Sequence, residues 1–452
     1  MLRINAGGRS GRYCDGLSRR SFVQVGVAGM ASVGLADVLR ATDRSSSGSS
    51  RSAILLWLDG GPSHMDLYDL KPDSPAEYRG IWSPISTNVP GMDIGELFPR
   101  QAKVADKFSI VRSLHHDTGD HFAGGHRMLT AKNMGVSGAN NAGKFPSIGA
   151  VLTRTLGPTK RGMPSYVSVP VASSIGLRPG YFGGNWMGGQ YDPFQTGGDP
   201  NNKNFQVQNL NLPKDMTVDR LADRRALVRS LDQISRNIDH SGEFLTRDRF
   251  DEDAFEFVAG DRARRAFDIG SEDDKIRDMY GRHTWGQSTL LARRLVEAGS
   301  RFVTVHFGGW DHHWNLKSGM ESHLPRVDSA VAGLFTDLDQ RGMLDSTIVI
   351  LCGEFSRTPR MNTGHNGKGT PGRDHWGNSM FCLLGGGGLK GGVIVGSTDA
   401  KGERPQNRPL EPDHIHATIY RSLGADPALH LLDHSGRPTA MIADPTPIAE
   451  LI

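Results

Sequence analysis

Several short apolar runs in this sequence end at an acidic residue or are closely followed by acidic and histidine residues. The run SAILLWL ends in Asp59, and the run STIVILC is followed by Glu354. The segments GGWDHHWN and GRDHWGN each combine aspartate with histidine. Carboxylates and imidazoles from separate segments, without cysteine, are ligands for zinc, manganese, magnesium or calcium. The predicted ligands of a divalent metal are Asp59, Asp311, His313, Glu354, Asp374 and His375.

Each of these residues also has a purely structural interpretation. A single aspartate at the end of a strand often caps the following turn, and Glu354 could pair with the nearby Arg357 or Arg360. The sequence does not distinguish His312 from His313 as the ligand. A metal centre is favoured because the same two residue types recur after several apolar runs.

The apolar runs are short, bounded by turn residues and separated by amphipathic helical segments. This pattern predicts an α/β fold with an open, mostly parallel sheet flanked by helices. Two helices are expected to stop at Gly299 and Gly342, where a glycine follows each apolar stripe. Ligands of such sheets bind beyond the carboxyl ends of the strands, which places the predicted metal there. The predicted strands are 53–58, 107–114, 166–169, 301–307, 347–352 and 380–384.

The N-terminal segment contains the motif SRRSF, with Arg19 and Arg20, followed by a mildly apolar stretch rich in glycine and alanine. This pattern is typical of a twin-arginine export signal and predicts a periplasmic or cell-envelope protein. An amphipathic helix or an anchor is the alternative, although the glycines make a stable membrane span a poor prediction. We assign 1–42 to the signal, 43–51 to a linker and 52–452 to one domain, with a helical insertion or lid around 215–280.

Charge and cysteine content exclude several classes of function. The chain carries a net charge of +3, but residues 1–42 contain six arginines and two aspartates, so the remainder carries −1. Nucleic acid is therefore not a predicted partner. The three cysteines do not support a cysteine-based metal cluster. Cys352 and Cys382 lie in apolar runs and are expected to be buried free thiols on neighbouring strands, with a disulfide as the alternative.

Five segments together resemble the bacterial family called domain of unknown function 1501, over about residues 52–423. They are LWLDGGPSHMDLYDLKP, HRMLTAKN, GQSTLLARRLVEAGSRFVTVHFGGWDHH, GEFSRTPRMN and GRDHWGN. Such proteins are common in planctomycetes and typically carry a twin-arginine signal. The family is placed in the alkaline phosphatase-like superfamily, beside sulfatases and cofactor-independent phosphoglycerate mutases. Its own reaction is not established.

The superfamily resemblance implies metal-binding roles for Asp59, for the pair Asp311 and His313, and for His375. It also places an Asp-His pair of ligands on Glu354 and Phe355, and phenylalanine cannot bind a metal. One imidazole ligand of the superfamily pattern is therefore missing.

The resemblance further implies a nucleophile near the segment HFAGGHRMLTA. Laid over the sulfatase motif, this segment places the nucleophile position on His121, where sulfatases have cysteine or serine. His121 could instead be a metal ligand, and Thr118 would serve as the nucleophile if the loop were shifted. Without a hydroxyl or thiol at this position, attack by metal-activated water is expected.

The predicted function is an exported, metal-dependent hydrolase of phosphate or sulfate esters, with Arg357 or Arg360 holding the anionic group. The alternative is a non-catalytic, metal-stabilised binding or scaffold protein with a degenerate site, which could pair with an exported cytochrome-type partner. A third alternative is carbohydrate binding, suggested by Trp186 and Tyr191 in GNWMGGQYDPF.

Overall fold

The computed structural model describes residues 50–134, 144–207, 254–364 and 369–452, with a few isolated positions between 208 and 253. The predicted signal at 1–42, most of the predicted linker and much of the predicted insertion lie outside these residues. The described end of the insertion includes the short helices α8 (Asp261–Phe267) and α9 (Asp274–Tyr280), and the insertion as a unit stays a prediction. In the described part of the chain, no helix combines the length and apolar character needed to cross a membrane.

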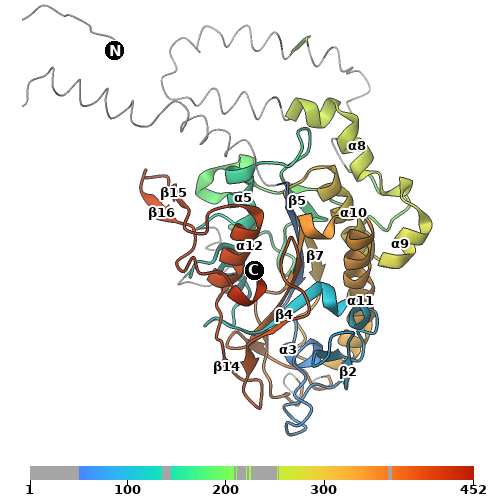
Figure 1. The fold of residues 1–452 in the computed structure, drawn as a ribbon, viewed down its shortest axis with the longest axis vertical. Coiled ribbons are helices and arrows are strands. Elements are labelled where there is room, and N and C mark those ends of the chain that lie inside the picture. The colour runs from blue at the N-terminus through green and yellow to red at the C-terminus, as the bar shows by residue number, and fades with distance from the viewer. Residues whose placement is uncertain are drawn as a thin grey trace, which may run out of the picture. The chain divides into compact units, whose positions relative to one another are not determined.

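A sheet of eight strands lies at the centre of the fold, and all the predicted strands belong to it (Figure 1). Its strand β1 (Ser52–Asp59) pairs in parallel with β7 on one side and β8 on the other. Every residue of β1 is buried, as expected for a strand covered on both faces. The order across the sheet is β12 (Ile394–Val395), β4 (Phe108–Leu114), β11 (Met380–Gly386), β8 (Thr347–Cys352), β1, β7 (Phe302–Gly308), β5 (Tyr166–Val169) and β6 (Phe194–Gln195).

Strand β11 is the exception to the parallel arrangement. It pairs antiparallel with β4 and β8, whereas the other neighbouring strands of the sheet pair in parallel. The beginning of β11 therefore lies at the edge where its neighbours end. This direction brings GRDHWGN, which precedes β11, to the edge where acidic residues and histidines follow β1, β7 and β8. The prediction of an open, mostly parallel α/β sheet is confirmed.

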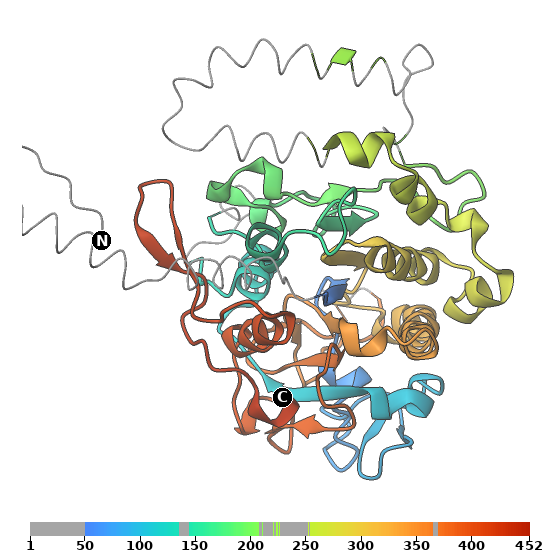
Figure 2. The ribbon, with the colours of Figure 1, turned by 45° about the horizontal axis from the view of Figure 1, so that its top comes forward.

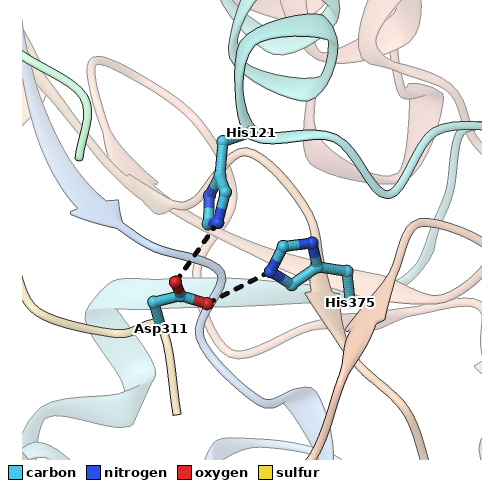
Figure 3. Close-up of side chains that lie close together, drawn as sticks. All are labelled: His121, Asp311 and His375. Atoms are coloured by element: carbon cyan, nitrogen blue, oxygen red, sulfur yellow. Dashed lines mark hydrogen bonds and ion pairs between the residues drawn. The ribbon is translucent and has the colours of Figure 1, made fainter. Parts of the chain in front are cut away.

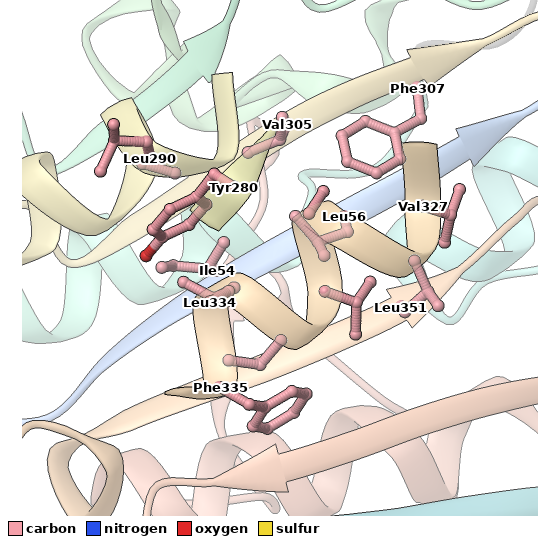
Figure 4. Packing of buried hydrophobic residues seen from close by; sticks show 14 of the residues in the cluster. Ile54, Leu56, Tyr280, Leu290, Val305, Phe307, Val327, Leu334, Phe335 and Leu351 are labelled. Carbon is pink, nitrogen blue, oxygen red and sulfur yellow. The ribbon is translucent and has the colours of Figure 1, made fainter. Parts of the chain in front are cut away.

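Helices cover both faces of the sheet (Figures 1 and 2). Ile54 and Leu56 belong to one hydrophobic cluster, and Leu55 and Trp57 belong to another. This division follows from strand geometry, which points successive side chains to opposite faces. Figure 4 shows the first cluster, in which β1 and β7 pack against a long helix. The helices of the first cluster include α10 (Thr284–Ala298) and α11 (Leu316–Gln340), and those of the second include α4 (His121–Thr130), α5 (Ile148–Leu156) and α12 (Pro412–Leu423).

The two predicted helix stops are confirmed. Gly299 follows α10 with a φ of 127°, and Gly342 follows soon after α11 with a φ of 66°. Both values lie where a side chain would be strained, so glycine suits these positions. Helix α11 begins earlier than its apolar stripe indicates, and Pro325 lies inside it.

Short two-stranded ladders lie outside the main sheet, and one of them matters for the site. In that ladder β9 (Ser356–Arg357) pairs with β10 (His375–Trp376), so that His375 lies opposite Arg357. The other ladders are β2 (Pro84–Ser86) with β3 (Asp93–Gly95), β13 (Ser397–Thr398) with β14 (Pro405–Asn407), and β15 (His430–Leu432) with β16 (Pro438–Ala440). Cys352 and Cys382 are buried free thiols on the neighbouring strands β8 and β11, as predicted.

Candidate metal centre

Three histidines converge on the carboxylate of Asp311. The Nε2 atoms of His313 and His375 each lie 3.1 Å from Asp311 Oδ1, and they are 3.0 Å from each other. The Nε2 atom of His121 lies 3.5 Å from Asp311 Oδ2. Figure 3 shows His121, Asp311 and His375, whose ligand atoms all lie within 4.8 Å of one another. Segments far apart in the sequence thus present nitrogen and oxygen atoms to one small volume.

Each of these side chains is placed by the start or end of an element. His121 is the first residue of α4, and the side chain of Asp120 fixes that start by accepting from the backbone N–H groups of Phe122 and Ala123. Asp311 and His313 lie in the loop after β7. His375 lies on β10, which precedes the antiparallel strand β11.

The second ring nitrogen of each histidine is held by an oxygen atom. In a metal-binding histidine, such a contact fixes the ring and directs the free nitrogen lone pair toward the metal. The arrangement therefore matches histidines that are oriented to bind a cation through Nε2. The Nδ1 atoms of His121, His313 and His375 lie 2.7, 2.7 and 2.6 Å from Glu354 Oε1, Asp374 Oδ1 and the carbonyl oxygen of Gly119, respectively.

Glu354 and Asp374 thus contact the histidines on the ring edge away from Asp311. Glu354 is fully buried, and its Oε1 also accepts the backbone N–H of Gly60 at 2.8 Å. Its Oε2 has no hydrogen-bond partner among the described residues. Burial raises the pKa of Glu354, and His121 opposes this effect only in part. A buried carboxylate with a free oxygen is costly, and a nearby cation would compensate it.

Asp59 lies at the end of β1 but contacts a different histidine. Its Oδ2 accepts the backbone N–H of Ile175 at 2.8 Å and lies 3.1 Å from Nε2 of His306. Its Oδ1 is buried and has no partner within the described part of the chain. Burial would raise the pKa of Asp59, but His306 and the Ile175 amide outweigh it and hold the pKa below its usual value.

His306 was missed by the sequence reasoning. It lies on β7 within the apolar segment RFVTVHFG, on the same face of the sheet as Asp59. A single polar residue in an apolar strand, close to the strand's carboxyl end, is the signal that could have identified it.

Arg357 is fully buried between the backbone and Asp311. Its Nε donates to the carbonyl oxygen of Gly61 at 2.8 Å and its Nη1 to that of Arg373 at 3.2 Å. Its Nη2 donates to the Gly60 carbonyl and lies 2.5 Å from Asp311 Oδ1. The guanidinium therefore holds Asp311 in place, and its predicted contact with a substrate anion stays a prediction. Arg360 is exposed.

The remaining predicted residues occupy peripheral places. Thr118 accepts the backbone N–H of Asp120 at 3.2 Å, and no contact with the histidine cluster is described for it. His312 packs near His323, with a ring separation of 5.4 Å, so His313 is the histidine of this pair that reaches Asp311. Trp186 and Tyr191 are partly buried against the second hydrophobic cluster, in keeping with loop packing.

The electrostatics of the cluster are dominated by His121 and Asp311. Burial opposes the charged form of His121, but Asp311 and Glu354 outweigh it and raise the pKa of His121 to about 9. Burial would raise the pKa of Asp311, yet His121, His375 and Arg357 hold it well below its usual range. Burial lowers the pKa of His375. The cluster therefore favours a positive charge beside Asp311, and a divalent cation would replace the proton on His121.

Residues 50–452 match the family described as Protein of unknown function (DUF1501). The chain belongs to this family. The match spans the whole described domain and confirms the resemblance found in the sequence motifs. No curated protein matches the chain.

Several solved structures resemble this member of the DUF1501 family, all at low sequence identity. PsFucS1 sulfatase from Pseudoalteromonas sp. is 12% identical, with a TM-score of 0.35, and the match covers 88% of this chain and 72% of that one. A protein in the alkaline phosphatase superfamily from Vibrio parahaemolyticus is 10% identical, with a TM-score of 0.34 and coverage of 84% and 67%. Alkaline phosphatase from the Antarctic bacterium TAB5 is 12% identical, with a TM-score of 0.36 and coverage of 83% and 99%.

The donor set fits a divalent metal. Three imidazole nitrogens and a carboxylate form a nitrogen-rich site of the kind that zinc prefers, and carboxylates hold the far edges of two of the rings. The free buried oxygens of Asp59 and Glu354 add negative charge that is not compensated by a hydrogen bond within the described residues. His121, Asp311 and His375 are the residues that would hold the metal, and His313 Nε2 lies beside them, 3.1 Å from Asp311 Oδ1.

Proposed function

We propose that this chain is an exported, metal-dependent hydrolase of phosphate or sulfate esters. The single observation that supports the metal most strongly is the convergence of three histidine Nε2 atoms on Asp311. In each of these histidines the Nδ1 atom contacts an oxygen atom. Export is inferred from the Arg19-Arg20 motif, which lies outside the described residues. A divalent cation bound here would polarise an ester oxygen and attract the anionic group of the substrate.

The protein's own groups have separate tasks in this proposal. Glu354 and Asp374 hold two of the histidines in the orientation that exposes Nε2. Arg357 fixes Asp311 through Oδ1. We assign proton transfer to His306, because Asp59 lies 3.1 Å from its Nε2 and leaves Nδ1 to take or give the proton. The side chain of His306 is 17% exposed, so a substrate group can approach it.

The structure also bears on the non-catalytic alternative. Phe355 occupies the position at which the superfamily pattern has a histidine ligand. It is buried, and its ring centroid lies 4.9 Å from that of His121 and 4.6 Å from that of His375. Phe355 thus packs against two of the convergent histidines. A scaffold that merely uses a metal for stability would keep the same arrangement, so turnover must be measured together with metal content.

The test compares Asp311→Ala with Asp345→Ala, an exposed aspartate outside the cluster. Metal content is measured by elemental analysis, and hydrolysis is measured with 4-nitrophenyl phosphate and 4-nitrophenyl sulfate. We expect Asp311→Ala to lose bound metal and turnover together, while Asp345→Ala keeps both. Bound metal without turnover of either ester in the unmodified protein would favour the scaffold alternative. Metal and turnover that both survive Asp311→Ala would contradict the assigned site.

A further inference from the structure

A tight turn beside Asp59 has a conformation that its sequence disfavours. Ser174 and Leu177 exchange both backbone hydrogen bonds, each at 2.9 Å, around a two-residue turn. The two central residues have positive φ values, 47° for Ile175 and 74° for Gly176. Such turns favour Asn, Asp or Gly at both positions, and a β-branched residue is strained in the left-handed region. The backbone conformation of Ile175 is therefore strained for an isoleucine.

Burial does not explain the isoleucine either. Ile175 is 40% exposed and Leu177 is 49% exposed, and the described residues include only three other large hydrophobic side chains with comparable exposure. Apolar surface left in water adds nothing to the stability of the fold. Strain held at a site without a structural gain is a recurrent feature of functional positions.

The turn lies against Asp59, the carboxylate that contacts His306. The backbone N–H of Ile175 donates to Asp59 Oδ2 at 2.8 Å. The backbone oxygen of Asp59 in turn accepts the N–H of Trp310, the residue before Asp311. A third exposed hydrophobic residue, Trp314, directly follows His313 and is 44% exposed. Exposed apolar side chains thus belong to the turn that contacts Asp59 and to the residue that follows His313.

We propose that the turn Ser174–Leu177 contacts the organic group of the ester, so that the substrates are esters with an apolar, aryl-type group. This inference rests on the proposed hydrolase function and adds the substrate class to it. The Ile175 amide anchors the turn to Asp59, and the side chains of Ile175 and Leu177 supply the apolar contact. Esters of small, fully polar alcohols lack the group that these side chains would cover.

The test uses two non-hydrolysable anions that differ in their organic group, phenylphosphonate and methylphosphonate. Their binding to the full chain loaded with zinc is measured by calorimetry. Covering about 50 Å² of phenyl surface corresponds to a preference of about tenfold for phenylphosphonate. We expect Ile175→Asn and Leu177→Ala each to reduce this preference to about threefold or less, with the affinity for methylphosphonate unchanged. Leu432→Ala, which removes another exposed leucine from β15, should leave both affinities unchanged.

Ile175→Asn also has its own folding control. Asparagine tolerates the left-handed conformation better than isoleucine, so the variant should melt at the same temperature as the unmodified protein or about 1 °C higher. A preference for phenylphosphonate that is absent, or that survives both substitutions while methylphosphonate binds, would overturn the apolar contact alone. Failure of the zinc-loaded protein to bind either phosphonate would overturn the proposed hydrolase together with this inference.

Discussion

Replacing Arg357 by lysine tests how the site is held together. The guanidinium is fully buried and donates to the carbonyl oxygens of Gly60, Gly61 and Arg373 as well as to Asp311. Lysine keeps the charge but has no planar fork, so it cannot reproduce donors that point in several fixed directions. We expect at least two of these hydrogen bonds to be lost.

The size of the effect follows from the buried groups that lose a partner. A hydrogen bond from a charged donor contributes about 1.5–3 kcal/mol, so losing two lowers the free energy of unfolding by about 3–6 kcal/mol. Asp311 also loses the contact that fixes its Oδ1, and removing such an outer contact typically weakens metal binding about 10–100-fold. Urea denaturation of the metal-free protein measures the first effect, and zinc titration against a competing chelator measures the second.

Arg360→Lys is the matched control, because Arg360 is exposed and lies on the same loop. It should change neither the unfolding free energy nor the zinc affinity. Our reasoning is refuted if Arg357→Lys also leaves both quantities unchanged. If that variant instead lost only phosphonate binding, the role of Arg357 as an anion clamp would replace the positioning role.

Three further predictions concern other parts of the structure. Burial raises the pKa of Asp328 to about 6, above its unfolded value of about 3.9. Between these two pH values the folded protein holds a proton on Asp328 that the unfolded chain has released. The stability that comes from this proton is therefore lost as pH rises from about 4 to 6. Relative to Asp328→Asn, the unmodified protein should lose about 2 kcal/mol of unfolding free energy between pH 4 and 7, measured by urea denaturation, and parallel profiles would contradict this. Because the pKa of His121 is about 9, zinc binding between pH 7 and 8.5 should release about one proton at this residue, measured by calorimetry in buffers of different ionisation enthalpy; a release equal to that of His121→Asn would be the opposing result. A Cβ at Gly124 would lie 2.8 Å from the carbonyl oxygen of Glu354. Gly124→Ala should therefore lower the unfolding free energy by about 1–3 kcal/mol and weaken zinc binding. An unchanged zinc affinity would show that the position of α4 does not affect the site.

The strands could be predicted from the sequence because a strand covered on both faces is apolar throughout. Strands such as β1 and β8 therefore stand out as uniform runs with ends near the predicted positions. The two-residue strands β6 and β12 are too short to give a pattern. The antiparallel direction of β11 could not be predicted either, since an apolar run has the same pattern in a parallel and an antiparallel strand. That direction decides whether His375 reaches the site.

The residue types of the site were predictable. The sequence could not show which residues face the metal position and which instead support a histidine ring. Glu354 and Asp374 were predicted as ligands, and the structure places one oxygen of each against an imidazole Nδ1. Which carboxylate faces inward depends on side-chain length and on the pairing of β9 with β10, and neither leaves a periodic signal. The sequence left His121 open as a nucleophile, a metal ligand or neither, and the geometry points its Nε2 toward Asp311.

The two buried carboxylates without a complete set of partners connect the fold to the proposed chemistry. Asp59 and Glu354 each keep one oxygen that no described residue satisfies, while the other oxygen of each accepts a backbone N–H. A fold selected for stability alone would protonate, pair or remove such groups, because each one costs about 1–3 kcal/mol. His306 and the Ile175 amide outweigh the burial of Asp59, whereas His121 supplies only part of the compensation for Glu354. The positive charge that would complete it is the charge that phosphate or sulfate ester chemistry requires.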